Sequence, residues 1–341
     1  MHLGARRVFR VSLTVSVALA VGYAMGMTMP YMAPVFGFLL SAAPKPPMAL
    51  KGLLGLLLVV AIMLSSGLML IPVLVHYPTT GLLLVLLGLF LANYVSLNLG
   101  KPPVGSLLAI GMTLITMVGQ LNYAVALLVV QELLICISIA VICQWLVYPF
   151  FPEDEAAPPS PPPPQPAESS WLAARATLVV FPSYLLGLTN PTAYTPIIMK
   201  SVALGQQANE TDVKSAGREL LGSTFMAGVF AILFWFGLKL TPNLWMFFLW
   251  TLLFSTFIVA RLYGVLPSRY PPTYWQNVLV TMFILIGPAV ADSANGKDPY
   301  AAFAVRMSLF IAVTLYAWAA LVFLDRLKAR DLWRKRHPGA A

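Results

Sequence analysis

The chain has 341 residues, of which 59% are hydrophobic and only 10% are charged. A soluble domain is about 45–50% apolar and about 25% charged, so this chain has too few charges to cover a soluble globule of its size. Its 21 Lys and Arg residues against 12 Asp and Glu residues give a formal net charge of +9. In a membrane protein such an excess collects in cytoplasmic loops, so we expect the partner to be a lipid bilayer and not a nucleic acid.

The apolar segments predict an all-α polytopic membrane protein with about twelve transmembrane helices, since a spanning helix needs about 20 mostly apolar residues. The segments of the first half are 8–27, 31–42, 49–75, 81–99, 104–118 and 122–150, and those of the second half are 171–188, 192–204, 217–238, 244–262, 275–291 and 302–324. Most basic residues fall on the cytoplasmic side if both termini are inside the cell. This bias predicts a multi-pass membrane protein with both termini cytoplasmic.

Recurring prolines predict that the chain consists of two copies of one unit. Pro34 and Pro196 are 162 residues apart, and Pro102 and Pro271 are 169 residues apart. An even number of spans in each unit makes the copies parallel, related by a pseudo-two-fold axis along the membrane normal. The predicted organisation is a first six-helix repeat at 1–151, a Pro-rich cytoplasmic linker at 152–170, a second six-helix repeat at 171–325 and a basic cytoplasmic tail at 326–341.

The second segment of each repeat is too short to cross a hydrocarbon core of about 30 Å, so we expect short or broken helices there. The expected helix breaks are Pro30, Pro34, Pro191 and Pro196. The N-terminal end of such a helix presents free amide groups and a positive dipole to an anion. The candidate anion-binding residues near these ends are Tyr31, Asn190, Thr192, Tyr194, Thr195 and Lys200. The alternative is that these stretches are only turns and that Lys200 reaches the inner membrane surface.

Charges inside the predicted spans are the second candidate site, because a charge near the bilayer centre is costly and usually faces the bundle interior. Glu132 is an acid within the sixth predicted span, and Arg306 stands 174 residues later at the corresponding place in the twelfth. We hypothesise that they form an intramembrane ion pair in which Glu132, helped by Gln131, carries a coupling proton while Arg306 holds an organic anion. The alternatives are a static pair that fastens the two halves, or charges that lie near the outer headgroups.

The sequence contains no metal-binding cluster, no arrangement for nucleophilic catalysis and no glycine-rich phosphate loop with its lysine. We therefore expect neither an enzyme nor a bound cofactor.

The two six-helix units and the motif Met29-Pro-Tyr-Met-Ala-Pro-Val-Phe-Gly37 resemble the fusaric acid resistance superfamily. That group includes aromatic-acid efflux proteins of Gram-negative bacteria and, more distantly, the aluminium-activated malate channels of plants. The resemblance implies efflux of small organic, aromatic acids across the inner membrane, driven by the proton motive force and assisted by a periplasmic membrane-fusion-type adaptor.

This sequence departs from the better-known efflux members, which carry sizeable cytoplasmic regions after their helix groups, because only a short linker and tail are expected here. The alternatives are a passive organic-anion channel and a membrane scaffold subunit that transports nothing. The oligomeric state is left open.

Overall fold

The computed structural model describes residues 3–99, 102–153, 166–210, 213–296 and 298–336, which form helices and connecting loops without any β-strand. The helices of the first half are α1 (Leu3–Ala24), α2 (Met32–Ser41), α3 (Leu50–His76), α4 (Pro78–Leu99), α5 (Pro102–Ile110), a π-helix (Gly111–Ile115), α6 (Thr116–Gly119), α7 (Tyr123–Val147) and a 3-10 turn (Tyr148–Phe150). Those of the second half are α8 (Pro166–Thr189), α9 (Pro191–Glu210), α10 (Val213–Leu240), α11 (Leu244–Leu262), α12 (Pro272–Ala294) and α13 (Pro299–Arg336).

Nine helices in the described part of the chain are long and apolar enough to cross a membrane, namely α1, α3, α4, α7, α8, α10, α11, α12 and α13. Large apolar side chains cover their outer faces. On α3, Leu50, Leu54, Leu58 and Ile62 are each at least 60% exposed and follow one another at four-residue spacing along one face. Such a face needs a lipid environment, so the predicted multi-pass membrane protein is confirmed at this level.

The remaining helices differ from the long ones in length or polarity. Helix α2 has 10 residues and is too short to span, as predicted. Helix α9 has 20 residues and is longer than the predicted segment 192–204. The expected breaks at Pro34 and Pro196 are corrected, because both residues lie inside continuous helices. Pro34 is tolerated there because the first turn of a helix has no internal acceptor for its N–H groups.

Pro30 and Pro191 mark helix starts. Pro30 lies just before α2, and Pro191 is the first residue of α9, where proline is favoured. Two predicted boundaries also move. Helix α8 begins at Pro166, within the predicted linker, and α13 continues to Arg336, through most of the predicted tail. Residues 154–165 of the linker and 337–341 of the tail lie outside the described residues.

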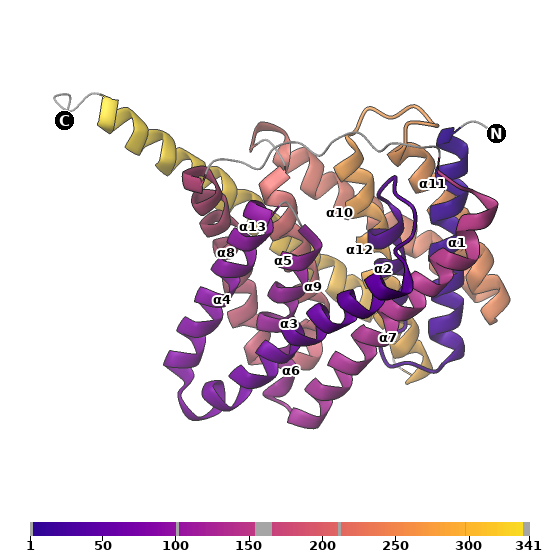
Figure 1. Cartoon of the computed structure of the whole chain (residues 1–341), viewed down its shortest axis with the longest axis horizontal. Helices are drawn as coiled ribbons and strands as arrows, with labels where there is room; N and C mark the ends of the chain where they lie inside the picture. Colours follow the sequence, from indigo (N-terminus) through magenta and orange to yellow (C-terminus); the bar gives the residue numbers. More distant parts are fainter. Residues whose placement is uncertain (1–2, 100–101, 154–165, 211–212, 297, 337–341) are drawn as a thin grey trace.

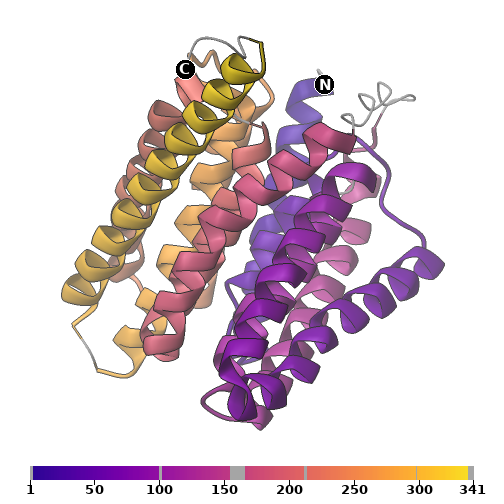
Figure 2. The same cartoon turned by 90° about the vertical axis from the view of Figure 1, so that its left-hand side faces the viewer.

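The helices pack as one bundle in which helices of the first half contact helices of the second half. Helix α1 packs against α11, and α4 packs against α8. Within the halves, α1 packs on α2 and α7, and α8 packs on α9 and α13. Helix α1 begins and α13 finishes at the same end of the bundle, here called the terminal end (Figures 1 and 2).

At the terminal end, ion pairs connect the first helix of each half with the region around the C-terminal end of the last helix of the same half. The fully buried Arg10 of α1 lies 2.8 Å from a carboxylate oxygen of Glu153, and Arg7 also pairs with this carboxylate. In the second half, Arg175 of α8 lies 3.1 Å from Asp325 of α13. Burial raises the pKa of Glu153, but the hydrogen bonds and charges of Arg7 and Arg10 outweigh burial, so the net pKa lies below its ordinary value.

Candidate functional site

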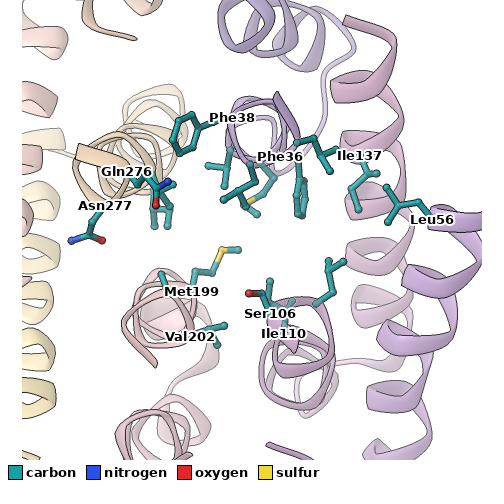
Figure 3. A pocket seen from close by; sticks show the side chains of 18 residues that line it. Phe36, Phe38, Leu56, Ser106, Ile110, Ile137, Met199, Val202, Gln276 and Asn277 are labelled. Atoms are coloured by element: carbon teal, nitrogen blue, oxygen red, sulfur yellow. The ribbon is translucent and has the colours of Figure 1, made fainter. Parts of the chain in front are cut away.

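A cavity of about 260 Å³ lies between helices of the two halves. Its walls come from α2, α3, α5 and α7 of the first half and from α9 and α12 of the second (Figure 3). Phe36 of α2, Ile137 of α7 and Met199 of α9 make it apolar, whereas Ser106 and Gln276 supply polar groups at its edge. The arrangement can hold a small, largely apolar molecule with one polar end.

The second helix of each half lines this cavity, α2 with residues from Met32 to Leu40 and α9 with residues from Met199 to Ala203. Helix α2 can do so because eight of its ten residues are buried, so it lies inside the bundle and not at its surface. On α9 the lining begins at Met199 and includes Val202 and Ala203. The N-terminal end of α9 lies away from the cavity, whereas α2 lines it from its first residue, Met32, so the predicted use of a helix N-terminus fits α2 alone.

Lys200 of α9 is completely buried beside the cavity wall. Its Nζ donates hydrogen bonds of 2.9 Å to Oδ1 of Asn277 and of 2.8 Å to Oγ1 of Thr281, both on α12. Asn277 also lines the cavity, and its carboxamide points away from the cavity centre (Figure 3). The alternative in which Lys200 reaches the inner membrane surface is therefore wrong, since its amino group lies in the interior, one side chain away from the cavity.

Glu132 of α7 is held by the loop between α1 and α2. Its carboxylate accepts hydrogen bonds from the backbone N–H of Thr28 at 2.7 Å and of Met29 at 2.9 Å, and from the Thr28 hydroxyl at 2.6 Å. A carboxylate with three such donors serves as an anchor for the backbone that leads into α2. Gln131 points outward, because adjacent helix positions face different directions, and it is exposed.

Arg306 of α13 pairs with Asp292 of α12, and this pairing corrects the hypothesis of an ion pair with Glu132. Tyr31 still links the two sites, because it follows Met29, which donates to Glu132, by two residues, and it contacts α12, which carries Asp292. Tyr31 is buried and packs against Gly287, where a Cβ atom would lie 2.2 Å from its ring. The three predicted residues thus gather near one another without forming the predicted pair.

The other predicted anion-binding residues lie at the start of α9. Asn190 precedes the helix and is exposed, and its carbonyl accepts the first backbone hydrogen bond, from Tyr194. The Thr195 hydroxyl donates to the Pro191 carbonyl within the helix at 2.8 Å. Thr192 belongs to the first turn of α9. Thr195 precedes Lys200 by five residues on α9, which is more than one helical turn, so these residues do not form one group with Lys200.

Sequence reasoning missed Asn277, Thr281 and Ser223. Asn277 and Thr281 stand four residues apart on α12, so they share a face, and a polar pair at this spacing in an apolar segment was the available signal. Ser223 of α10 accepts a hydrogen bond from Asn277 Nδ2 at 2.5 Å. Among the described residues, no group of three or more His, Cys, Asp or Glu side chains could hold a metal ion.

Residues 7–147 match the model of a family described as "Protein of unknown function (DUF2955)". The match begins within α1 and ends at the last residue of α7, so it covers the first six predicted spans. No curated protein and no solved structure matches the chain. The part of the chain that resembles the DUF2955 family thus extends from α1 to α7.

Proposed function

We propose that the chain is an inner-membrane exporter of small organic acids, built from two parallel six-helix repeats. Mirrored packing supports the repeats, since α1 on α11 corresponds to α4 on α8, and α1 with α2 and α7 corresponds to α8 with α9 and α13. The ion pairs Arg10–Glu153 and Arg175–Asp325 also recur at matching places. The match to the DUF2955 family ends where the first repeat is proposed to end.

The observation that carries the transport proposal is the cavity between the repeats, with a buried lysine beside it. Repeat transporters bind their substrates at the interface of the repeats, near the middle of the membrane. At about 260 Å³ the cavity is smaller than the roughly 300–1,000 Å³ of pockets for drug-sized ligands, which favours a small substrate. Its apolar walls suit the ring of an aromatic acid, and the Lys200 charge behind Asn277 favours an anion.

The direction and the driving force follow from the sign of the substrate. In a bacterial cell the interior is negative, and about 2.3 kcal/mol per 100 mV favours exit of each negative charge. We propose that the membrane potential of the proton motive force drives the anion outward, with the terminal end and both termini in the cytoplasm. The resemblance to the fusaric acid resistance superfamily supports this direction, as well as a periplasmic membrane-fusion-type adaptor.

The test is flux in proteoliposomes that contain the purified full-length protein. Vesicles loaded with radiolabelled benzoate receive an inside-negative potential through a potassium gradient and valinomycin, and loss of label is compared with that from protein-free vesicles. We expect potential-dependent efflux that 4-substituted benzoates of increasing size inhibit until the substituent exceeds the cavity. Met199→Trp fills the cavity and should reduce this efflux, whereas Leu58→Trp on the lipid-facing side of α3 should not.

Efflux equal to that of protein-free vesicles would contradict transport and favour the scaffold alternative. Efflux that is fast, unsaturable and insensitive to Met199→Trp would contradict use of the cavity and favour the channel alternative.

A further inference from the structure

Lys200 and its hydrogen-bonding partners form a polar cluster in which the amino group is only a donor, and each partner that donates does so to another group than this nitrogen. Nζ donates to Asn277 Oδ1 and to Thr281 Oγ1, and Thr281 donates onward to Asn277 Oδ1 at 3.2 Å. Asn277 Nδ2 donates to Ser223 Oγ, which donates to the backbone carbonyl of Leu220 at 3.1 Å. The cluster therefore presents only acceptors to Nζ, and these oxygen dipoles stabilise an ammonium group.

No carboxylate neutralises this lysine among the described residues. Among the described charged side chains on the helices packed against α9, Arg306 pairs with Asp292, Arg175 pairs with Asp325, and Arg326 is exposed. A buried charge without a counter-ion costs several kcal/mol, which neutral dipoles offset only in part. The amine can therefore exist in two states of comparable free energy, a neutral one and a charged one that a nearby anion would stabilise.

The cluster continues as a ladder of polar side chains toward the terminal end. One turn before Asn277 on α12 stands Thr273, whose hydroxyl donates at 3.5 Å to Glu219, one turn before Ser223 on α10. Both helices begin at that end, at Pro272 and Val213. With a rise of about 1.5 Å per residue, Thr281 lies roughly 13 Å into α12, so two polar pairs, one helical turn apart, lie between Lys200 and the proposed cytoplasmic side.

The polar cluster belongs to the second half alone. The 162-residue spacing of Pro34 and Pro196 matches Lys200 with Phe38, and the 169-residue spacing of Pro102 and Pro271 matches Asn277 with Leu108. Both counterparts are apolar. Packing the fold does not require the cluster at this place, since the equivalent place in the first half is filled without one.

We propose that Lys200 is a proton-binding site, loaded from the cytoplasmic side along the ladder of Glu219 and Ser223, whose charged state makes the cavity accept an organic anion. The inference rests on the proposed transport function. One proton from the cytoplasm converts the neutral amine to the ammonium, and by linkage the anion and the proton each bind more tightly when the other is present. When acid accumulates in the cytoplasm, the cytoplasmic pH falls and Lys200 becomes protonated. The charged lysine then increases the affinity of the cavity for the anion of that acid.

The test measures proton binding and anion binding separately. Purified protein labelled with ¹³C at lysine is followed by NMR as the pH is varied, and the Lys200 signal is assigned through Lys200→Arg. We expect this signal to change with pH in the neutral range. Adding benzenesulfonate, which is an anion at every pH used, should shift the Lys200 transition to higher pH.

Flux of benzenesulfonate in proteoliposomes then tests the consequence. Wild-type flux should rise as the pH at the terminal end falls. Lys200→Met should reduce the flux at low pH about 10- to 100-fold, the range for loss of a hydrogen bond to a charged group. Lys200→Arg, always charged, should carry flux that no longer depends on pH. Asn277→Asp adds a counter-ion at almost unchanged volume and should suppress flux at all pH values, and Lys239→Gln should behave as wild type.

The possible failures are distinguishable. A Lys200 signal that does not change with pH, together with pH-independent wild-type flux, would overturn the proton site and leave the transport proposal standing. A Lys200 signal that titrates, in a protein that moves no benzenesulfonate at any pH, would overturn the transport proposal.

Discussion

At the scale of single residues, the charged groups inside this bundle fall into two kinds. Glu132, Arg306 and Arg10 each have a strong local partner, whereas Lys200 has only neutral acceptors. A charge held by an opposite charge or by several donors fixes structure, because changing its state would break bonds it already makes. A buried charge without a counter-ion can change state with a ligand. The residue to which the sequence drew most attention, Glu132, is of the first kind.

We therefore predict that Glu132→Gln lowers stability and leaves the pH dependence of flux unchanged. The glutamine amide group would face the N–H groups of Thr28 and Met29 and lose at least one charged hydrogen bond, which is worth about 1.5–3 kcal/mol. Thermal unfolding in detergent should show a reduced Tm, and the exposed neighbour variant Gln131→Ala should show none. A Glu132→Gln protein with wild-type Tm and an altered pH profile would restore the proton-coupling role to this residue.

Glu153 gives a second prediction, on the pH dependence of stability. Its pKa is lower in the folded protein, so its contribution is present above the pKa of the unfolded chain and is lost as the pH falls through the folded value. Glu153→Gln should cost about 1.5–3 kcal/mol at neutral pH and progressively less in acid. Asp325→Asn, at the more exposed matching pair, should cost less. A Tm difference between wild type and Glu153→Gln that stays constant into acid would contradict this account.

Sequence reasoning could find Lys200 but not its partners. A lysine in an apolar segment is visible in the sequence, whereas its contact with Asn277 depends on how α9 packs on α12, 77 residues away. Glu132 and Arg306 were paired on repeat symmetry alone. The structure supplies each with a nearer partner, because the loop before α2 and the end of α12 come closer than the opposite half does.

At the scale of helices, the number and order of elements could be predicted, because apolar length is a local property of the sequence. A helix lies at each of the twelve predicted segments, with α5, the π-helix and α6 forming one of them. The π-helix could not be predicted. It follows Ile110, which lines the cavity, and it packs against α3, where Gly67 meets Gly111. Tertiary packing, which no local pattern reveals, determines this distortion.

This crossing gives a third prediction. A Cβ atom on Gly67 would lie 2.0 Å from the Gly111 carbonyl oxygen, so Gly67→Ala must push α3 away from the π-helix. We expect a loss of about 1–3 kcal/mol, measured as a lower Tm, together with reduced benzoate flux as the cavity wall moves. Gly55→Ala, on the same helix with no atom within 4 Å of the added Cβ, is the matched control and should be neutral or slightly stabilising. Equal Tm values for the two variants would show that the crossing is not a tight contact.

At the scale of the whole molecule, the two halves are joined chiefly by packing between helices. Helix α1 lies on α11, α4 lies on α8, and α2 and α5 meet α12 and α9 around the cavity. The cavity belongs to neither half, since each contributes only part of its wall. A function located there requires both halves but does not require that they be one chain.

The last prediction follows from this division. Residues 1–153 and 154–341, expressed together as separate chains, should assemble and recover benzoate flux. The mirrored contacts remain, and only the effective concentration that the tether provides, of millimolar order for a short linker, is lost. An affinity tag on the first chain should retain the second through purification, and Gly187→Trp should prevent this, because Gly187 of α8 packs against Met117 of the other half.

Either chain alone should be degraded or aggregate, since the faces of α1, α4, α8 and α11 would be left without partners. Two halves that are each stable alone and do not copurify would instead indicate two independent bundles, and the cavity between them would then have no functional meaning.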